Sequence, residues 1–227
     1  MNRLMNRRNV FITGATGYMG RALVRELVRR GHEVRALVRR GSEAKLPAGC
    51  ECVVGDPLDA ATYLERVAPA DTFVQLVGVP RPSPAKARQF REIDLASARA
   101  SVAAAANAGV AHFVYVSVAQ PAPVMKAYQA ARAEAEHAIR ESGLRATVLR
   151  PWYVLGPGRR WPVVLIPLYK LCELIPSKRE TARRLGLVTH EQMTRALAAA
   201  VEHPAADFRV VTVPEIRNAE CRMMNDE

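Results

Sequence analysis

The sequence predicts an α/β fold in which helices cover both faces of a doubly wound, parallel β-sheet. Short runs of apolar and β-branched residues alternate with segments whose apolar residues recur at helical spacing, through most of the first 150 residues. A glycine-rich turn joins the first of these runs to the first helical segment. Strict alternation requires crossover connections between strands, which are typical of parallel sheets. We expect residues 1–227 to form a single domain of this type.

The first half of the chain supplies four expected strands and three expected helices. The first helix carries Leu23 and Leu27 on one face and stops at Gly31, and the second is opened by Pro57. The third is rich in alanine and ends at the turn NAGV. The expected strands are 9–13, 33–39, 50–56 and 71–79, and the expected helices are 18–31, 57–68 and 84–107.

The second half continues the alternation and then departs from it. Strands are expected at 112–118 and 145–151, with a helix at 126–143 between them. After Pro151 the rhythm breaks, and we expect residues 156–185 to form an insertion on the side of the sheet that binds substrate. A helix with Thr189 as its N-cap and a last strand at 208–213 follow, and 218–227 are expected to form a flexible tail.

Composition excludes several classes of protein. The net charge of +11 is due almost entirely to arginine, but these residues are spread over the whole chain without a nucleic-acid-binding motif. The four cysteines and five histidines lack the spacing of a metal site, so we expect none, with thiols that are buried or half-buried in a reducing compartment. Partners are therefore expected to be small molecules, not nucleic acid.

No segment predicts export or membrane insertion. The basic N-terminal residues lead into NVFITGATG with no apolar signal region, and the apolar stretch from Trp161 is broken by prolines and charges. These features favour a cytoplasmic protein. Association of basic residues within 159–184 with an anionic membrane surface is a minor alternative, since the prolines interrupt any long amphipathic helix.

The turn ITGATGYMG indicates a phosphate-binding loop. It places Gly14, Gly17 and Gly20 between the first strand and the first helix, where backbone amides and the helix dipole attract a phosphate. An ordinary tight turn is the alternative, but the strand–helix–strand context is that of dinucleotide-binding Rossmann folds. The residues expected against the pyrophosphate are Gly14, Thr16, Gly17, Tyr18, Met19 and Gly20.

The end of the second strand favours NADP(H) over NAD(H). A carboxylate there holds the ribose 2′-hydroxyl in NAD-selective proteins, whereas this chain has Arg39 and Arg40, which would bind a 2′-phosphate. In an arginine-rich protein, the alternative is a pair of solvated side chains at the end of a strand.

Tyr128 and Arg132 lie four residues apart in a segment without helix breakers, so we expect both on one face of a helix. One interpretation is a proton-transfer site. The other is that Arg132 forms an exposed i,i+4 pair with Glu136, which contributes only about 0.3 to 0.5 kcal/mol.

Together these motifs resemble the short-chain dehydrogenase/reductase superfamily, specifically its atypical branch of NmrA-like and NAD(P)H-binding proteins. The similarity runs from Asn9 to about Pro214 and includes TGATGYMG, ALVRR, the GD at residues 55–56, VYVS, YQAARAE, TVLRPWYVLGPG and LVTHEQM.

The resemblance implies roles for further residues. It implies that Asp56 contacts the adenine, that residues 76–79 line the ribose on the nicotinamide side, and that residues 151–154 flank the nicotinamide. It further implies that Ser117 polarises a substrate carbonyl and that Tyr128 donates a proton. The additional cofactor residues are Asp56, Leu76, Val77, Gly78, Pro151, Trp152, Tyr153 and Val154.

Arg132 departs from the family pattern, because active members carry a lysine that bonds the ribose and lowers the pKa of the tyrosine. Arginine supplies the charge, but it stays protonated and cannot pass a proton onward. We therefore expect an NADPH-dependent reductase acting on a small carbonyl, quinone or enone. A regulator or assembly factor that senses NADP(H) without turnover is the alternative.

Overall fold

The computed structural model describes residues 7–157 and 184–219. Its centre is a seven-stranded sheet in the order β3-β2-β1-β4-β5-β6-β9, in which each neighbouring pair is parallel. The strands are β1 (Asn9–Thr13), β2 (Glu33–Val38), β3 (Glu51–Val54), β4 (Thr72–Gln75), β5 (His112–Val116), β6 (Ala146–Leu149) and β9 (Phe208–Val211). The prediction of a parallel sheet is confirmed.

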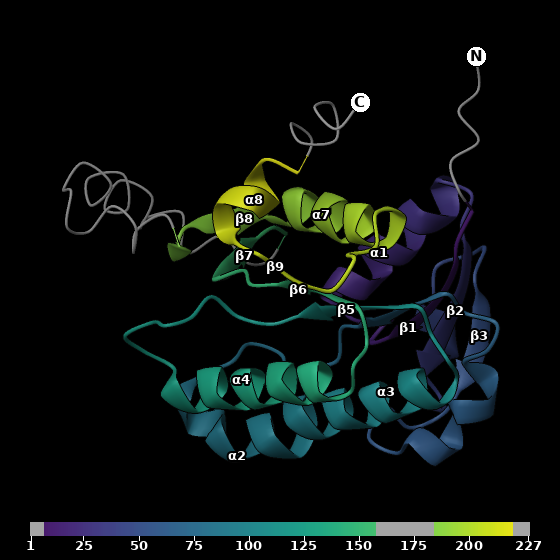
Figure 1. Cartoon of the computed structure of the whole chain (residues 1–227), viewed down its shortest axis with the longest axis horizontal. Helices are drawn as coiled ribbons and strands as arrows, with labels where there is room; N and C mark the ends of the chain where they lie inside the picture. The colour runs from purple at the N-terminus through teal and green to yellow at the C-terminus, as the bar shows by residue number, and fades with distance from the viewer. Residues whose placement is uncertain (1–6, 158–183, 220–227) are drawn as a thin grey trace.

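Helices cover both faces of this sheet (Figure 1). One layer contains α1 (Tyr18–Arg29), α7 (His190–Glu202) and α8 (Val213–Arg217), and the other contains α2 (Ala87–Gln89), α3 (Ala96–Asn107) and α4 (Lys126–Glu141). The sheet is therefore doubly wound, as predicted.

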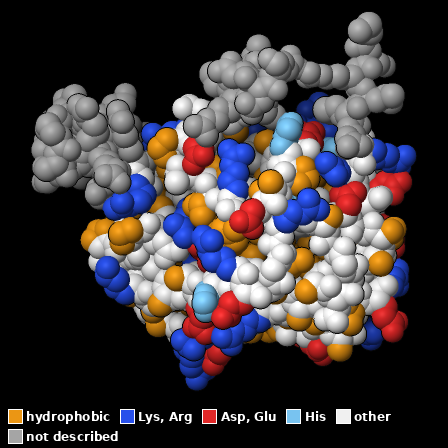
Figure 2. All heavy atoms as spheres, viewed as in Figure 1, with side chains coloured by type: hydrophobic (Ala, Val, Ile, Leu, Met, Phe, Trp, Pro, Cys, Tyr) orange, Lys and Arg blue, Asp and Glu red, His pale blue; other side chains and the backbone are white. Residues whose placement is uncertain are grey.

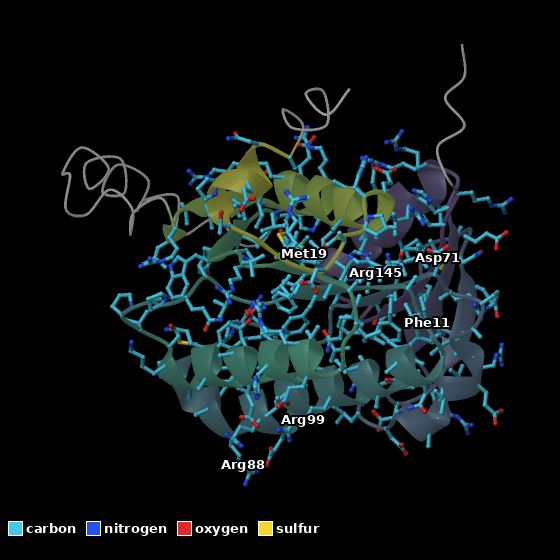
Figure 3. All side chains as sticks on the ribbon, in the orientation of Figure 1. Phe11, Met19, Asp71, Arg88, Arg99 and Arg145 are labelled. Carbon is cyan, nitrogen blue, oxygen red and sulfur yellow. The ribbon has the colours of Figure 1, made fainter. Side chains whose placement is uncertain are left out.

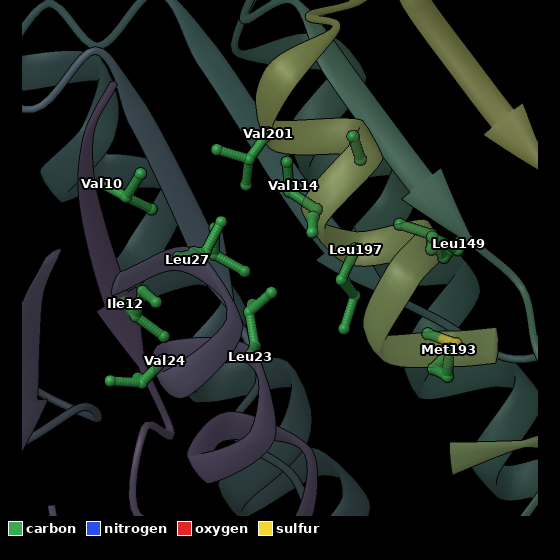
Figure 4. Close-up of a cluster of buried hydrophobic side chains, with 14 of the residues drawn as sticks. Val10, Ile12, Leu23, Val24, Leu27, Val114, Leu149, Met193, Leu197 and Val201 are labelled. Atoms are coloured by element: carbon green, nitrogen blue, oxygen red, sulfur yellow. The ribbon is translucent and has the colours of Figure 1, made fainter. Parts of the chain in front are cut away.

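Alternate residues of the buried strands supply two separate cores. Val10 and Ile12 of β1 face α1 and α7 in a cluster that includes Leu23, Leu197 and Val201 (Figure 4). Phe11, between them in sequence, points to the opposite face and lies 5.2 Å from the ring of Phe73 (Figure 3). Because β1 is covered on both faces, its sequence is a continuous apolar run instead of an alternating one.

The predicted helix over 57–68 is wrong. Two short 3₁₀ turns, η2 (Ala60–Thr62) and η3 (Leu64–Arg66), stand in its place. Asp59 accepts a hydrogen bond from the amide of Ala61, and the Thr62 hydroxyl donates to the carbonyl of Asp59. These local side-chain bonds compete with the backbone bonds of an α-helix.

The segment predicted as one helix over 84–107 is helical throughout but not uniform. It begins with the 3₁₀ turn η4 (Pro84–Lys86) and α2, and a π-helical segment, η5 (Phe90–Leu95), precedes α3. A further 3₁₀ turn, η1 (Glu43–Lys45), follows β2. A π-helical turn shifts the direction in which side chains point and is frequent at functional sites.

The C-terminal part contains elements that the sequence did not predict. The strands β7 (Tyr153–Leu155) and β8 (Leu187–Thr189) form a separate parallel pair, and α8 follows β9. Thr189 caps α7 as predicted, in a capping box with Gln192. Most of the proposed insertion at 156–185 and of the tail at 218–227 lies outside the described residues.

Candidate functional site

The glycine-rich loop has two positions, Gly14 and Gly20, at which a Cβ would clash with backbone atoms. Gly14 has a φ of +77°, and a Cβ there would lie 2.7 Å from the carbonyl carbon of Leu76. A Cβ at Gly20 would overlap the carbonyl oxygen of Gly14. The loop leads into α1, whose N-cap residue is Gly17. No side chain caps this end of the helix with a hydrogen bond. The first amides of α1 can therefore bind an anion.

The loop lies where the strand order reverses. The chain moves from β1 through α1 to β2, and from β4 through α3 to β5 on the other side, so β1 and β4 diverge. The amide of Leu76 donates to the carbonyl of Thr13, which joins the ends of these two strands. Ligands of doubly wound proteins bind at this type of switch point, and the loop therefore fits a dinucleotide.

Arg39 and Arg40 follow β2 and are both exposed. Neither side chain forms a hydrogen bond or ion pair within the described part of the chain. The amide of Gly55 bonds the carbonyl of Val38, which holds the ends of β2 and β3 together, and Asp56 follows, with its carboxylate accepting from the amide of Leu58. This edge of the sheet thus carries two arginines that are available to an anionic ligand.

The basic residues do not gather into one patch on the face shown in Figure 2, where blue and red side chains are interspersed. Arg88 and Arg99 extend away from the helical layer on the opposite side of the sheet from α1 (Figure 3).

Tyr128 and Arg132 lie together on α4, as predicted. The guanidinium of Arg132 lies 5.1 Å from the centre of the Tyr128 ring, which packs against Phe90 at 4.9 Å. The alternative of an exposed pair between Arg132 and Glu136 is wrong, because both side chains are buried and each has a different partner. Helical spacing brings the residues near each other, but tertiary contacts decide which groups pair.

Arg132 is bound on several sides. Its Nη2 lies 2.6 Å from Oδ1 of Asp94, and its Nη1 donates to the carbonyl of Val116 and the hydroxyl of Tyr115. Burial raises the pKa of the Tyr115 hydroxyl to about 12. Burial raises the pKa of Asp94 as well, and Arg132 opposes that rise by favouring the carboxylate.

Ser117 is buried at the end of β5, and its hydroxyl donates to Oε1 of Glu136 at 2.5 Å. The same carboxylate accepts from Gln120 and is paired with Arg150. The Ser117 proton is therefore directed into this network, and the hydroxyl would have to leave Glu136 in order to donate to a substrate oxygen.

The segment 151–154 follows β6 and includes the first two residues of β7. Trp152 packs against Ala119, Ala122 and Leu185, so part of its ring is buried in this small hydrophobic cluster. The side chain of Gln129 stabilises the loop that contains residues 122–124. It accepts a hydrogen bond from the amide of Ala122 and donates one to the carbonyl of Val124. The basic residues within 159–184 that the sequence suggested for a membrane surface lie, apart from Arg184, outside the described residues.

Tyr18 connects the phosphate loop to the C-terminal elements. Its ring lies 4.3 Å from that of His190, and Nε2 of His190 donates to the Tyr18 carbonyl at 3.1 Å. A Cβ at Gly156 would overlap the Tyr18 hydroxyl and lie 2.9 Å from Cβ of His190, so a side chain just after β7 would displace the Tyr18 ring.

Sequence reasoning missed Asp94 and the network of Glu136 and Arg150. Asp94 sits inside a helical pattern, and no motif around it signals a buried charge.

Cys52, expected to be at least half-buried, is exposed, while Cys50 is half-buried. The described ranges contain no cluster of three or more metal-binding side chains. They contain no helix with the length and apolar character that a membrane crossing requires.

Comparison with known proteins identifies the family and several similar proteins. A family model described as NAD(P)H-binding matches residues 14–164. The chain is 31% identical over 180 residues to a ceramide reductase of Caulobacter vibrioides, covering 77% of this chain and 55% of that protein. It is 30% identical over 157 residues to a chloroplastic divinyl chlorophyllide a 8-vinyl-reductase of Oryza sativa subsp. indica, covering 63% and 39%. The chain thus spans about half or less of the length of these relatives.

Solved structures show the same fold. WbmH of Bordetella bronchiseptica, in complex with NAD⁺, has a TM-score of 0.67 at 20% identity, with 97% of this chain and 82% of that chain covered. A double mutant of DesIV, a dTDP-glucose 4,6-dehydratase from Streptomyces venezuelae, has a TM-score of 0.66 at 20% identity, with 96% and 81% covered. At this identity the likeness concerns the fold alone. With the family match over residues 14–164 and the shape of the glycine loop, the chain belongs to the NAD(P)H-binding family of atypical short-chain dehydrogenases/reductases.

Proposed function

We propose that this protein is an NADPH-dependent reductase that transfers hydride to a small carbonyl, quinone or enone substrate. The observation that carries the proposal is the phosphate loop, closed to side chains at Gly14 and Gly20, in a fold whose neighbouring strand end presents Arg39 and Arg40. The reductase names of the two relatives support a redox activity.

The cofactor would be held along the carboxyl edge of the sheet. Backbone amides from Gly14 to Gly20 would bind the pyrophosphate, and Arg39 with Arg40 would bind the 2′-phosphate. Asp56 would lie at the adenine, residues 76–78 at the ribose on the nicotinamide side, and residues 151–154 beside the nicotinamide.

When bound, the reduced nicotinamide supplies the hydride. Tyr128 gives its phenolic proton to the substrate oxygen and recovers a proton from solvent, while Arg132 orients the ring beside it. Ser117 assists the same oxygen only after its hydroxyl turns away from Glu136.

A second function has its own support. Arg132 is engaged by Asp94 and the Ser117 proton by Glu136, so two groups proposed for chemistry are occupied by protein partners. These contacts favour a protein that binds NADP(H) and responds to it without turnover.

The test is NADPH oxidation against a panel of quinones, aldehydes and enones, with Tyr128→Phe and Arg132→Lys variants alongside. Turnover that depends on Tyr128 supports the reductase. Tight nucleotide binding without turnover in the wild type and in both variants supports the regulator. A faster Arg132→Lys variant indicates an enzyme that the arginine weakens.

A further inference from the structure

Asp94 is a fully buried carboxylate held between two parts of the candidate site. Its Oδ2 accepts a hydrogen bond of 3.0 Å from the amide of Val79, in the loop that follows β4. Its Oδ1 lies 2.6 Å from Nη2 of Arg132 on α4. One side chain in η5 therefore joins the loop expected at the nicotinamide-side ribose to the helix that carries Tyr128.

The loop and the arginine also fit each other directly. A Cβ at Gly78 would lie 2.5 Å from Nη2 of Arg132 and 3.1 Å from Oδ1 of Asp94. The guanidinium therefore occupies space that only a glycine leaves open. Gly78, Asp94 and Arg132 form a single packed unit.

The charges within this unit compensate each other. A buried guanidinium without a counter-ion is costly, and breaking a buried ion pair by removing one partner leaves the other charge uncompensated. Each oxygen of Asp94 faces a donor, which is the pattern of an ionised carboxylate. Tyr128 therefore lies beside a neutral pair and not beside a free cation.

We propose that Asp94 is a positioning residue of the cofactor site, which binds Arg132 and the amide of Val79 together so that they hold the loop at residues 76–79 as one unit. Arg132 then acts on the cofactor and on Tyr128 through the geometry it maintains, not as an unpaired positive charge. This inference rests on the proposed NADP(H) site, and it adds a residue to that site that the sequence motifs do not include.

The test is a double-mutant cycle on NADPH affinity, measured by fluorescence titration with Asp94→Asn, Arg132→Gln and the double variant. Asparagine at position 94 has one acceptor oxygen for two donors, and glutamine at position 132 leaves the Asp94 carboxylate without its counter-ion. Each single variant is therefore expected to weaken NADPH binding about tenfold. The double variant should lose no more than the weaker-binding single variant, because the two residues act as one unit. Losses that multiply to about a hundredfold would overturn the proposal.

Glu134→Gln is the matched control, because Glu134 is a partly exposed carboxylate on α4 that pairs with Arg99. It should leave NADPH affinity unchanged. A single variant can fail to fold because it leaves a buried charge unpaired. The double variant has neither charge, so its NADPH affinity can be measured in that case as well. An affinity about a hundredfold below that of the wild type would count against the proposal.

The same cycle separates the two ideas. A wild type that binds no NADPH would defeat the proposed function, whereas a wild type that binds NADPH and shows multiplying losses in the two single variants would overturn only the positioning role of Asp94.

Discussion

Gly20, in the first turn of α1, lies so close to the carbonyl group of Gly14 that no side chain fits between them. A Cβ at position 20 would overlap that oxygen and lie 2.7 Å from the α-carbon of Ala15, so the obstruction is backbone that cannot rotate away. The path of the chain from the loop into α1 therefore requires a residue without a side chain at position 20.

Gly20→Ala is therefore expected to displace the phosphate loop and to weaken NADPH binding about 10- to 100-fold, since such overpacking costs roughly 1 to 3 kcal/mol. Fluorescence titration measures the effect. Arg25→Ala is the control, because Arg25 is an exposed residue of the same helix. Equal losses in the two variants would contradict the role assigned to Gly20.

Arg39→Ala should separate the two nucleotides. A hydrogen-bonded pair with a phosphate contributes about 1.5 to 3 kcal/mol, so NADPH binding should weaken about 10- to 100-fold, while NADH binding should change little. Arg88→Ala removes an exposed arginine on α2 and should affect neither. A similar loss for both nucleotides would show that Arg39 does not bind the 2′-phosphate.

Tyr128→Phe should reduce turnover about 10²- to 10⁴-fold, the range typical of a lost general acid. NADPH affinity should stay close to that of the wild type, because the ring packing against Phe90 is kept. Steady-state kinetics with a substrate from the panel, combined with direct binding, checks both expectations. A variant that retains full activity would remove Tyr128 from the mechanism.

His112 gives the fold a defined pH dependence. Burial lowers the pKa of His112 to about 4, and its Nε2 accepts from the amide of Ala205. Between pH 6.5 and about 4 the unfolded chain binds a proton that the folded chain does not, so stability should fall as pH is lowered through this window. The loss is at most about 3 kcal/mol.

Urea unfolding at several pH values would measure this dependence. His112→Gln should flatten the slope between pH 6.5 and 4, whereas His137→Gln should not, because the side chain of His137 is largely exposed and pairs with Glu141 on the surface of α4. A slope that is the same in the wild type and in His112→Gln would show that another group is responsible.

The parts of the fold that could be predicted are those that local pattern determines. A few neighbouring residues are enough to predict the apolar strand β1, the apolar face of α1 and the N-cap at Thr189. The phosphate loop is local in the same sense, because its glycines are required by the path of a single turn.

The rest depends on partners that are distant in sequence. Helical spacing left open an Arg132–Glu136 pair as an alternative, but Arg132 pairs with Asp94, 38 residues away, and Glu136 pairs with Arg150. The strands β7 and β8 have three residues each, too few to show a period. In the 57–68 segment, the hydrogen bonds of Asp59 and Thr62 outweighed the helical propensity of its alanines.

The measurement that most directly tests the central claim is calorimetric titration of the purified protein with NADPH and, separately, with NADH. The account predicts one saturable site per chain, with NADPH bound more tightly and the difference lost in Arg39→Ala. Absence of measurable binding to either nucleotide would contradict it.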